Sequence, residues 1–525
     1  MNANDRAKTA SLFCHDLPTR PRPGTGRVLV TGATGYIGGR LVSELMARGY
    51  TVRIMVRMPS SEHAQRWPDA EIVLGDAFSL PCLVDSLEGV SVAYYLIHSL
   101  LLGPRDVEAA ETIAAANFRR AAEICHLDRI IYLGGLGDVK DSLSRHLRSR
   151  HQVAVELRKG SVPVTVLRAA VIVGSGSAAF EIIKALVHQA PFIPMPSWTS
   201  TRCQPIGIRD VIKYLVGVLE LPRTAGDSFD IGGPETLTYR QMMETMAAVM
   251  GVKQRFISSP FTSVTVNAYL TSLITPVPAP ITRCLLEGIV NEVVCRNHTI
   301  GTLIPMDLVS YEETLARALA REELETVTTR WSDAYPRDHA FAVRLHQLPR
   351  PPLYRASAAI TSEKDPRELF RSVCTIGGKR GWFTTHHLWR LRGMADRLML
   401  GVGIARGRKS LAALRVNDVI DFWRVEQLEK DEKLLLRAEM KLPGLAWLEF
   451  TIRPRHTVHQ LSVTGYFDPR GMWGKPYWYL FLPFHHFIFH DLICQIEKNA
   501  SNRNFQAETA MAGVNSPPHP KKEKI

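Results

Sequence analysis

The chain has 525 residues, of which 46% are apolar and 22% charged, and its formal net charge is +13. It is too long for one compact core, and its composition excludes a largely disordered chain, a collagen-like fibre and a coiled-coil rod. Residues 351–525 contain 27 Lys+Arg and 17 Asp+Glu, whereas residues 1–350 contain 37 and 34. The basic C-terminal third suits an anionic partner, or it serves solubility alone.

The spacing of the cysteines and the composition of the N-terminus indicate the cellular compartment. The eight cysteines are scattered without a Cys-x-x-Cys pair, which argues against a disulfide framework and favours a reducing cytosol. Residues 1–24 lack the apolar core of a secretion signal, and no run of about 18 apolar residues suggests a spanning helix. His485, His486 and His490 lack a carboxylate or cysteine at ligand spacing, so we expect no metal site. We expect a cytoplasmic protein, with peripheral membrane contact as a further option.

Short apolar segments alternate with amphipathic ones over the first 173 residues. After a flexible N-terminus at 1–25, we predict strands and helices in alternation. The predicted strands are 27–31, 51–56, 71–74, 91–97, 129–133 and 162–173, and the predicted helices are 40–48, 105–126 and 143–159. Such alternation is typical of a doubly wound parallel α/β sheet, whose ligands bind at the carboxyl ends of the strands.

Residues 174–325 follow a looser pattern, which we interpret as the substrate-side region of a domain covering 26–325. Helices are predicted at 210–221, 238–250 and 308–325, a short strand at 228–233, and an apolar, proline-interrupted segment at 260–280. Residues 326–364, with Pro349, Pro351 and Pro352, are predicted to be a linker.

Tryptophans are frequent beyond the linker, where residues 365–500 form a second predicted domain of the α+β class. Segments 419–425, 434–440 and 446–452 alternate apolar and polar residues, which predicts antiparallel strands with one solvated face. Residues 484–499 are predicted to be a closing helix, and the polar residues 501–525 a disordered tail.

Glycines recur at intervals of three directly after the first predicted strand and before the first predicted helix. This spacing allows a tight turn and close approach of the backbone to a pyrophosphate, and the helix N-terminus supplies unpaired N–H groups to the anion. The motif predicts a dinucleotide site, and a glycine turn without a ligand is the alternative. The predicted contact residues of this turn are Gly32, Thr34, Gly35, Tyr36, Ile37 and Gly38.

The end of the second predicted strand bears on the choice between NAD and NADP. An acidic residue there would bind the ribose 2′-hydroxyl of NAD, whereas an arginine accommodates the 2′-phosphate of NADP. The segment 51–57 contains Arg53 and Arg57 and no acidic residue. We therefore favour NADP over NAD, with Arg57 as the contact, the alternative being that Arg57 is a solvated surface cation.

The segment 28–38, Val-Leu-Val-Thr-Gly-Ala-Thr-Gly-Tyr-Ile-Gly, resembles the opening of the extended and atypical short-chain dehydrogenase/reductases. Segments 75–76, 95–99, 133–136 and 167–170 extend the resemblance, which is strongest to the group that includes the Rossmann-like accessory subunit of respiratory complex I. It implies an NAD(P)-binding Rossmann domain. The further cofactor contacts that it implies are Asp76, Ala77, Ile97, His98 and Gly134. For Asp76, a turn after Gly75 is the alternative.

Classical members of this superfamily use a Tyr-x-x-x-Lys pair, in which tyrosine is the general acid/base and lysine holds the nicotinamide ribose. This chain has His146-x-x-x-Arg150 at the equivalent spacing, and segment 134–137 lacks the usual hydroxyl partner. An arginine can hold a ribose hydroxyl but cannot shuttle a proton, whereas a histidine can donate one. His146 and Arg150 are therefore the catalytic candidates, the alternatives being a surface helix residue and an ion-pair partner.

Residues 365–500 resemble the uncharacterised domain DUF2867, often fused behind such a Rossmann domain in bacteria. The segments that carry this resemblance include 329–334, 388–393, 421–425 and 466–471. We expect a curved antiparallel sheet around a long helix, similar to the lipid-binding START/Bet v 1 type, with an apolar cavity. The aromatic residues alternate with apolar ones and are predicted to be core rather than a stacking surface for nucleic acid.

These observations leave three hypotheses. The first is an NAD(P)-dependent oxidoreductase that acts on an apolar small molecule, such as an isoprenoid, quinone or lipid, with the C-terminal domain binding or delivering it. The second is a non-catalytic nucleotide-binding assembly or sensor protein, which the missing Tyr-x-x-x-Lys pair favours. The third is a lipid or quinone carrier. The expected partners are a nicotinamide dinucleotide, an apolar ligand and a membrane surface, and not nucleic acid.

Overall fold

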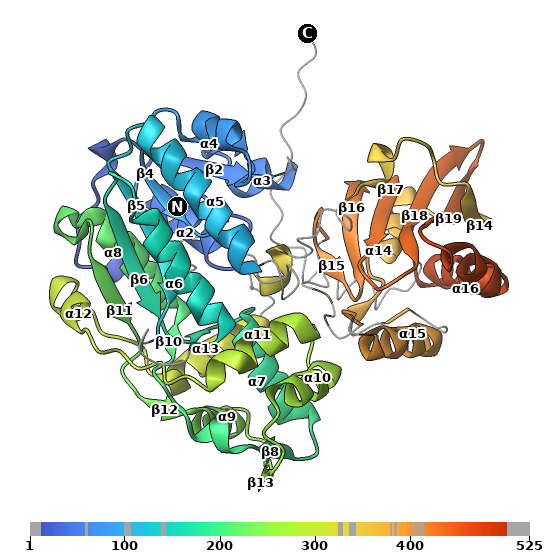
Figure 1. Ribbon diagram of the computed structural model, residues 1–525. Coiled ribbons are helices and arrows are strands. Elements are labelled where there is room, and N and C mark those ends of the chain that lie inside the picture. The colour runs from blue at the N-terminus through green and yellow to red at the C-terminus, as the bar shows by residue number, and fades with distance from the viewer. Residues whose placement is uncertain are drawn as a thin grey trace. The chain divides into compact units, whose positions relative to one another are not determined.

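The computed structural model describes residues 12–57, 61–98, 107–137, 143–323, 329–334, 343–378, 381–382, 386–399, 401–403, 406, 408 and 414–500. They divide into two compact units with a boundary near residue 338. We call them the nucleotide unit and the C-terminal unit, and Figure 1 shows the elements of each.

A seven-stranded parallel sheet forms the centre of the nucleotide unit (Figure 1), in the order β11-β6-β5-β4-β1-β2-β3. The strands are β1 (Arg27–Val30), β2 (Val52–Val56), β3 (Glu71–Leu74), β4 (Val90–Tyr95), β5 (Arg129–Gly135), β6 (Val164–Ala169) and β11 (Ser228–Ile231). The chain proceeds outward from β1 in both directions, so a crevice opens at the carboxyl ends of β1 and β4, where such sheets bind ligands. The predicted doubly wound sheet is confirmed.

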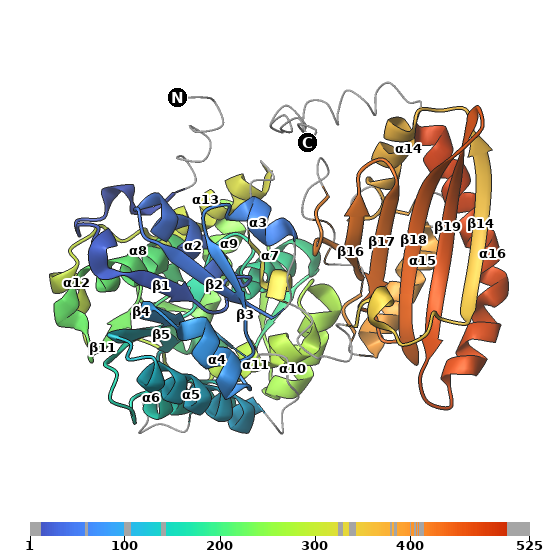
Figure 2. The same ribbon diagram turned by 90° about the horizontal axis from the view of Figure 1, so that it is seen from above.

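Helices cover both faces of this sheet, as Figure 2 shows from above. Apolar side chains of α2 (Gly38–Ala47) and α8 (Ile208–Glu220) pack on one face. Those of α4 (Leu80–Leu87), α5 (Val107–Ile124) and α6 (Arg145–Leu157) pack on the other. The short α3 (Ser61–Arg66) connects β2 to β3.

The substrate-side region contains more helices than the sequence pattern predicts. They are α7 (Ala178–Gln189), α9 (Tyr239–Val249), α10 (Val264–Ile274), α11 (Ala279–Ile289), α12 (Thr299–Leu303) and α13 (Tyr311–Glu323), with short strands β7 (Ile172–Val173), β8 (Ile193–Met195), β9 (Arg202–Cys203), β10 (Ile206–Gly207), β12 (Leu237–Thr238) and β13 (Phe256–Ser258). We did not predict α7 or α11. Ser177 caps α7 by accepting from the Phe180 N–H at 3.2 Å, and Pro280 lies in the first turn of α11, where proline is tolerated.

The C-terminal unit is a six-stranded antiparallel sheet, in the order β14-β19-β18-β17-β16-β15, with helices packed against it (Figure 2). The strands are β14 (Tyr354–Ser362), β15 (Val419–Ile420), β16 (Trp423–Glu429), β17 (Lys433–Ala438), β18 (Gly444–Arg455) and β19 (Val458–Pro469), and the helices are α14 (Pro366–Val373), α15 (His386–Leu398) and α16 (Gly474–Ala500). The long α16 packs on β14, β19 and α14. This confirms the α+β class, while the similarity to the START type stays a prediction.

Described parts of the two segments that we predicted to be a flexible N-terminus and a linker pack against the units instead. Residues 12–25 lie on α2, because the buried Glu44 carboxylate accepts backbone N–H groups from Phe13 at 2.5 Å and Cys14 at 3.1 Å. Within the expected linker 326–364, residues 354–362 form β14, and residues 343–348 pack apolar side chains on Leu435 and Trp447. Residues 1–11 and the predicted tail 501–525 lie outside the described residues.

The predicted strand 419–425 is interrupted. It divides into β15 and β16 because Asp421 has a φ of +55°, which turns the chain. The closing helix predicted at 484–499 is instead the much longer α16. None of the helices described here, α16 included, is long and apolar enough to cross a membrane.

Candidate functional site

The glycine turn joins β1 to α2 in a conformation that requires glycine at two positions. Gly32 has a φ of +65°, and a Cβ there would lie 2.7 Å from the Leu96 carbonyl oxygen. A Cβ on Gly38 would lie 2.3 Å from the Gly32 carbonyl oxygen. The turn therefore offers a bare backbone, and the positive end of the α2 dipole begins at Gly38, so the residues present fit the pyrophosphate of a dinucleotide.

A cleft of about 340 Å³ opens over this turn, which is within the range of small-molecule sites. Its base is the glycine turn, and the ends of β4, β5 and β6 form one side. The predicted site residues that line it are Gly32, Gly35, Tyr36, Ile37, Gly38, His98, Gly134, His146 and Arg150. Two predicted sets, the glycine turn and the His146–Arg150 helix, therefore meet in one cleft.

The remaining predicted contacts do not line this cleft; they are Thr34, Arg57, Asp76, Ala77 and Ile97. Arg57 and Asp76 are exposed just after β2 and β3. The Asp76 carboxylate accepts the Phe78 N–H at 3.0 Å, as a turn-forming aspartate does. Arg53 cannot reach a cofactor, because it is buried and donates to the Ser86 and Glu88 carbonyls at 2.9 and 2.8 Å.

His146 lies in the cleft beside a second histidine. Its ring centroid is 4.9 Å from that of His98, and the Nδ1–H of His98 donates to the Glu111 carboxylate at 2.8 Å. Glu111 also accepts the hydroxyl of Ser149. Burial alone would raise the pKa of Glu111, but the hydrogen bond and charge of His98 lower it well below its ordinary range. Because an ionised carboxylate only accepts, His98 must carry its proton on Nδ1 and present Nε2 to its surroundings.

His146 and Arg150 contribute differently to the cleft. Burial, together with the nearby charges of His98 and Arg150, lowers the pKa of His146 to about 3, so its ring is neutral at physiological pH. Arg150 donates to the carbonyls of Leu133 and, at 3.5 Å, Ile97, and its guanidinium lies 4.8 Å from the centre of the Tyr132 ring. Arg150 therefore holds the ends of β4 and β5 together and places a fixed positive charge in the cleft. Neither residue is a plain surface side chain.

A second, apolar pocket of about 160 Å³ adjoins the cleft. Its lining comes from α7, α9, α10 and α11 and is aliphatic apart from a few groups such as Asn267, whose amide already donates to the Phe261 and Ser263 carbonyls. The two cavities have walls in common: Val171, Ala179, Tyr239 and Leu285 line both. The apolar pocket is therefore adjacent to the dinucleotide cleft.

Several residues of the site could not be predicted from the sequence. Glu111 lies on a correctly predicted helix, but no local pattern shows that it will face His98. Tyr239, Leu285 and Trp331 line the cleft from segments far along the chain, and only long-range packing brings them there. In the described part of the chain, no group of three or more His, Cys, Asp or Glu side chains could hold a metal ion.

Comparison with protein-family models gives two matches. Residues 24–290 match the NmrA-like family, and residues 349–492 match a protein family of unknown function, DUF2867. The first match covers the whole parallel sheet and every residue that lines the cleft except Val293 and Trp331, and the second covers the antiparallel sheet with most of α16.

Individual relatives resemble the nucleotide unit at modest identity. A ceramide reductase of Caulobacter vibrioides is 28% identical over 246 residues, 45% of this chain and 74% of the relative. A subunit of mitochondrial NADH dehydrogenase [ubiquinone] from Arabidopsis thaliana is 24% identical over 279 residues, 50% of this chain and 69% of the relative.

Among solved structures, a nucleoside-diphosphate-sugar epimerase from Staphylococcus aureus aligns with a TM-score of 0.46 at 14% identity, covering 55% of this chain and 99% of the other. Since the NmrA-like model matches half of the chain, the protein belongs to the NmrA-like family, with an NAD(P)-binding Rossmann domain followed by a DUF2867 domain.

Proposed function

We propose that the protein is an NAD(P)-dependent reductase of an apolar small molecule. One observation carries this proposal: the dinucleotide cleft and the apolar pocket share Tyr239, Leu285 and two smaller residues. A bound nicotinamide supplies a hydride, and the apolar pocket supplies the binding energy for a substrate next to it. The relative named as a ceramide reductase agrees with an apolar substrate class.

The choice of dinucleotide rests on Arg57. It is exposed at the end of β2, where the adenosine ribose of a dinucleotide lies in this fold. A guanidinium there pairs with a 2′-phosphate, whereas an acidic side chain would repel it. NADP is therefore the proposed cofactor, and NAD the weaker alternative.

The proton chemistry falls to the two histidines. Neutral His146 donates a hydrogen bond through its ring N–H to a polarised substrate oxygen, but it does not carry an extra proton near neutrality. His98, oriented by Glu111, is the group whose second nitrogen can take up and release a proton. Arg150 stabilises negative charge that develops nearby. The sequence assigns proton donation to His146 alone. In the proposed chemistry, His146 donates a hydrogen bond and His98 exchanges the proton.

The apolar pocket can be tested with a pair of matched variants on α10. Leu270 and Val266 are both 51% exposed, but only Leu270 lines the pocket. Leu270→Asp should weaken binding of a long-chain aliphatic ketone, measured calorimetrically, by about tenfold or more, because a carboxylate would be desolvated by the ligand. Val266→Asp should leave it unchanged. Equal affinities in both variants would remove the pocket from the proposal.

The C-terminal unit has a surface suited to bringing an apolar substrate from a membrane. Trp473, Leu480, Phe484 and Phe487 follow helical spacing and are 72%, 66%, 52% and 65% exposed, so they form one apolar face on α16 and the residue before it. Residues 476–490 contain no charged side chain other than histidine, while the C-terminal third as a whole is basic. We propose that this face enters the interface of an anionic membrane and that the protein is cytoplasmic and peripheral.

Vesicle sedimentation tests this contact. The intact protein should sediment with phosphatidylglycerol-containing vesicles and less with pure phosphatidylcholine. Phe484→Glu combined with Phe487→Glu should reduce the bound fraction at least about tenfold, because each buried phenylalanine contributes about 1.5–3 kcal/mol. Leu353→Glu, which changes a 93% exposed residue outside α16, is the matched control. Unaltered sedimentation of the double variant would contradict the proposal.

A further inference from the structure

The segment Thr329–Ala334 lies between the two matched families, since the first match ends at residue 290 and the second begins at residue 349. We call it the junction segment. Its last four residues, Trp331–Ala334, form a short 3-10 helix, and the chain leads from there to the C-terminal unit. The sequence predicts a linker here and counts the segment among those that resemble DUF2867, but it lies outside the DUF2867 match and is folded onto the nucleotide unit.

The junction segment is attached to the glycine turn itself. The hydroxyl of Thr329, which is fully buried, donates to the Tyr36 carbonyl at 2.9 Å. A Cβ on Gly39 would lie 2.8 Å from the Thr329 methyl group, so α2 and the junction segment approach closely only because residue 39 is glycine. A displacement of the glycine turn would therefore also displace Thr329.

A second attachment holds the segment to the loop before α7. The backbone N–H of Trp331 donates to the Gly176 carbonyl at 2.8 Å, and Gly176 has a φ of +82° with no room for a side chain against Thr329 and Arg330. Internally, the Arg330 N–H donates to the Asp333 carboxylate at 2.9 Å. The segment therefore has a fixed conformation over the cleft.

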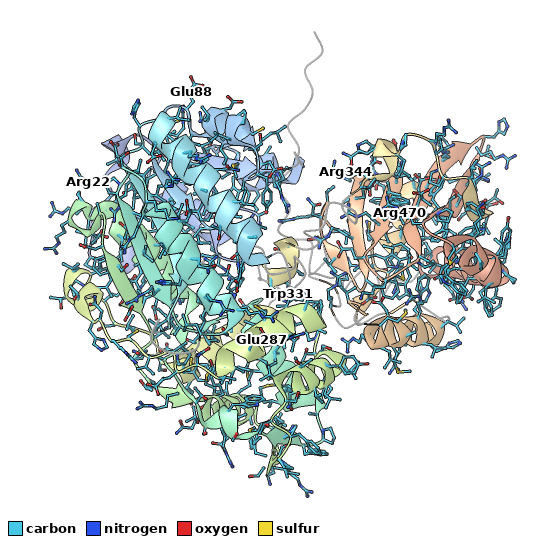
Figure 3. All side chains as sticks on the ribbon, viewed as in Figure 1. Arg22, Glu88, Glu287, Trp331, Arg344 and Arg470 are labelled. Carbon is cyan, nitrogen blue, oxygen red and sulfur yellow. The ribbon has the colours of Figure 1, made fainter. Side chains whose placement is uncertain are left out.

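Trp331 forms part of the wall of the dinucleotide cleft. It lines the cleft together with Cys284, Leu285 and Gly288 of α11, and it packs on Ile182 and Ile281 behind. Figure 3 labels Trp331 on the 3-10 helix and Glu287 on α11. A large, half-buried indole that faces a cavity offers a flat apolar surface to a ring or a ribose.

We propose that the junction segment is part of the cofactor site: Trp331 positions the bound dinucleotide, and occupation of the cleft rigidifies residues 329–334. The inference rests on the proposed dinucleotide binding and adds a wall to that site. Because Thr329 and Trp331 are bonded to the two loops that line the cleft, a ligand that orders those loops orders the junction as well.

The test uses the full chain and NADPH, with fluorescence titration as the readout. Trp331→Ala should raise the Kd for NADPH about tenfold, as removal of a contacting tryptophan commonly does, whereas Trp331→Phe should retain most of the affinity. Trp198, also half-buried in the nucleotide unit but lining only the apolar pocket, gives the matched control Trp198→Ala. Energy transfer from tryptophan to bound NADPH should fall more in Trp331→Ala than in the control.

Hydrogen exchange gives a second readout that does not depend on activity. NADPH should slow exchange in peptides covering residues 329–334 of the intact protein, and Thr329→Val, which loses the bond to Tyr36, should reduce that protection. Unchanged affinity and energy transfer in Trp331→Ala, with NADPH still bound by the parent protein, would overturn this inference alone. Failure of the parent protein to bind NADPH would overturn the proposed function instead.

Discussion

Replacing Gly35 by aspartate should lower the affinity for NADPH at least about a hundredfold, because a carboxylate would stand beside the pyrophosphate in a site that offers only backbone N–H groups to it. Gly35 is less constrained than Gly32 and Gly38, because its φ is ordinary and a Cβ would lie 3.2 Å from the Gly32 carbonyl oxygen, a tight contact that a shift of a few tenths of an ångström relieves. The variant should therefore fold, and calorimetric titration should report the loss of binding.

Two further substitutions at this position separate charge from size. Gly35→Asn has nearly the same volume as aspartate without the charge, and Gly35→Ala adds only the Cβ. Affinity should fall in the order alanine, asparagine, aspartate, with the largest step between the last two and with that step shrinking at high salt. Equal affinity in Gly35→Asp and Gly35→Asn would mean that no anion binds at the turn.

Glu439→Gln should destabilise the C-terminal unit by about 3–5 kcal/mol, because it removes the partner of buried cations. The Glu439 carboxylate accepts from Arg406 at 2.7 Å and Arg424 at 2.5 Å, and Arg437 lies 3.8 Å away. All of these side chains are under a tenth exposed. Denaturant unfolding followed by the fluorescence of Trp382, Trp389 and Trp423, which cluster in this unit, measures the change.

The same carboxylate predicts a pH dependence. Burial raises the pKa of Glu439, but Arg424 and Arg406 outweigh it and lower the pKa below its ordinary value. A lowered pKa contributes stability above the ordinary glutamate range that is lost as the pH falls through the lowered pKa. Glu439→Gln should lack this pH-dependent contribution to the free energy of unfolding. The exposed Glu432→Gln is the control, and a Glu439→Gln protein as stable as Glu432→Gln would contradict the argument.

The parts of the fold that repeat a local pattern could be predicted from the sequence. The strands of the parallel sheet lie within a few residues of their predicted positions, because each is a short apolar run between turns. The glycine turn was predictable for the same reason, since strand, turn and helix are contiguous. In contrast, α11 begins amid Pro276, Pro278 and Pro280, which locally indicate a loop.

Only part of the candidate site can be predicted from local sequence patterns. His146 and Arg150 could be found by their spacing on one helix, yet the neutral state of His146 results mainly from burial by distant segments, with a smaller effect of His98 after another strand. No sequence signal places Glu111 or Trp331 in the cleft, because their roles arise from contacts made across 13 residues to His98 and across 155 residues to Gly176. Tertiary packing, not propensity, decides which side chains complete the cleft.

Hydride transfer from NADPH to an apolar substrate is the measurement that decides whether the protein is a reductase. The full chain is incubated with NADPH deuterated at the transferring carbon and a panel of apolar ketones, conjugated alkenes and quinones, and the products are analysed by mass spectrometry. We expect deuterium in an apolar product, and much less with Gly35→Asp. Tight binding of NADPH with no deuterium in any product would contradict a reductase and leave a nucleotide-binding protein that performs no chemistry on these substrates.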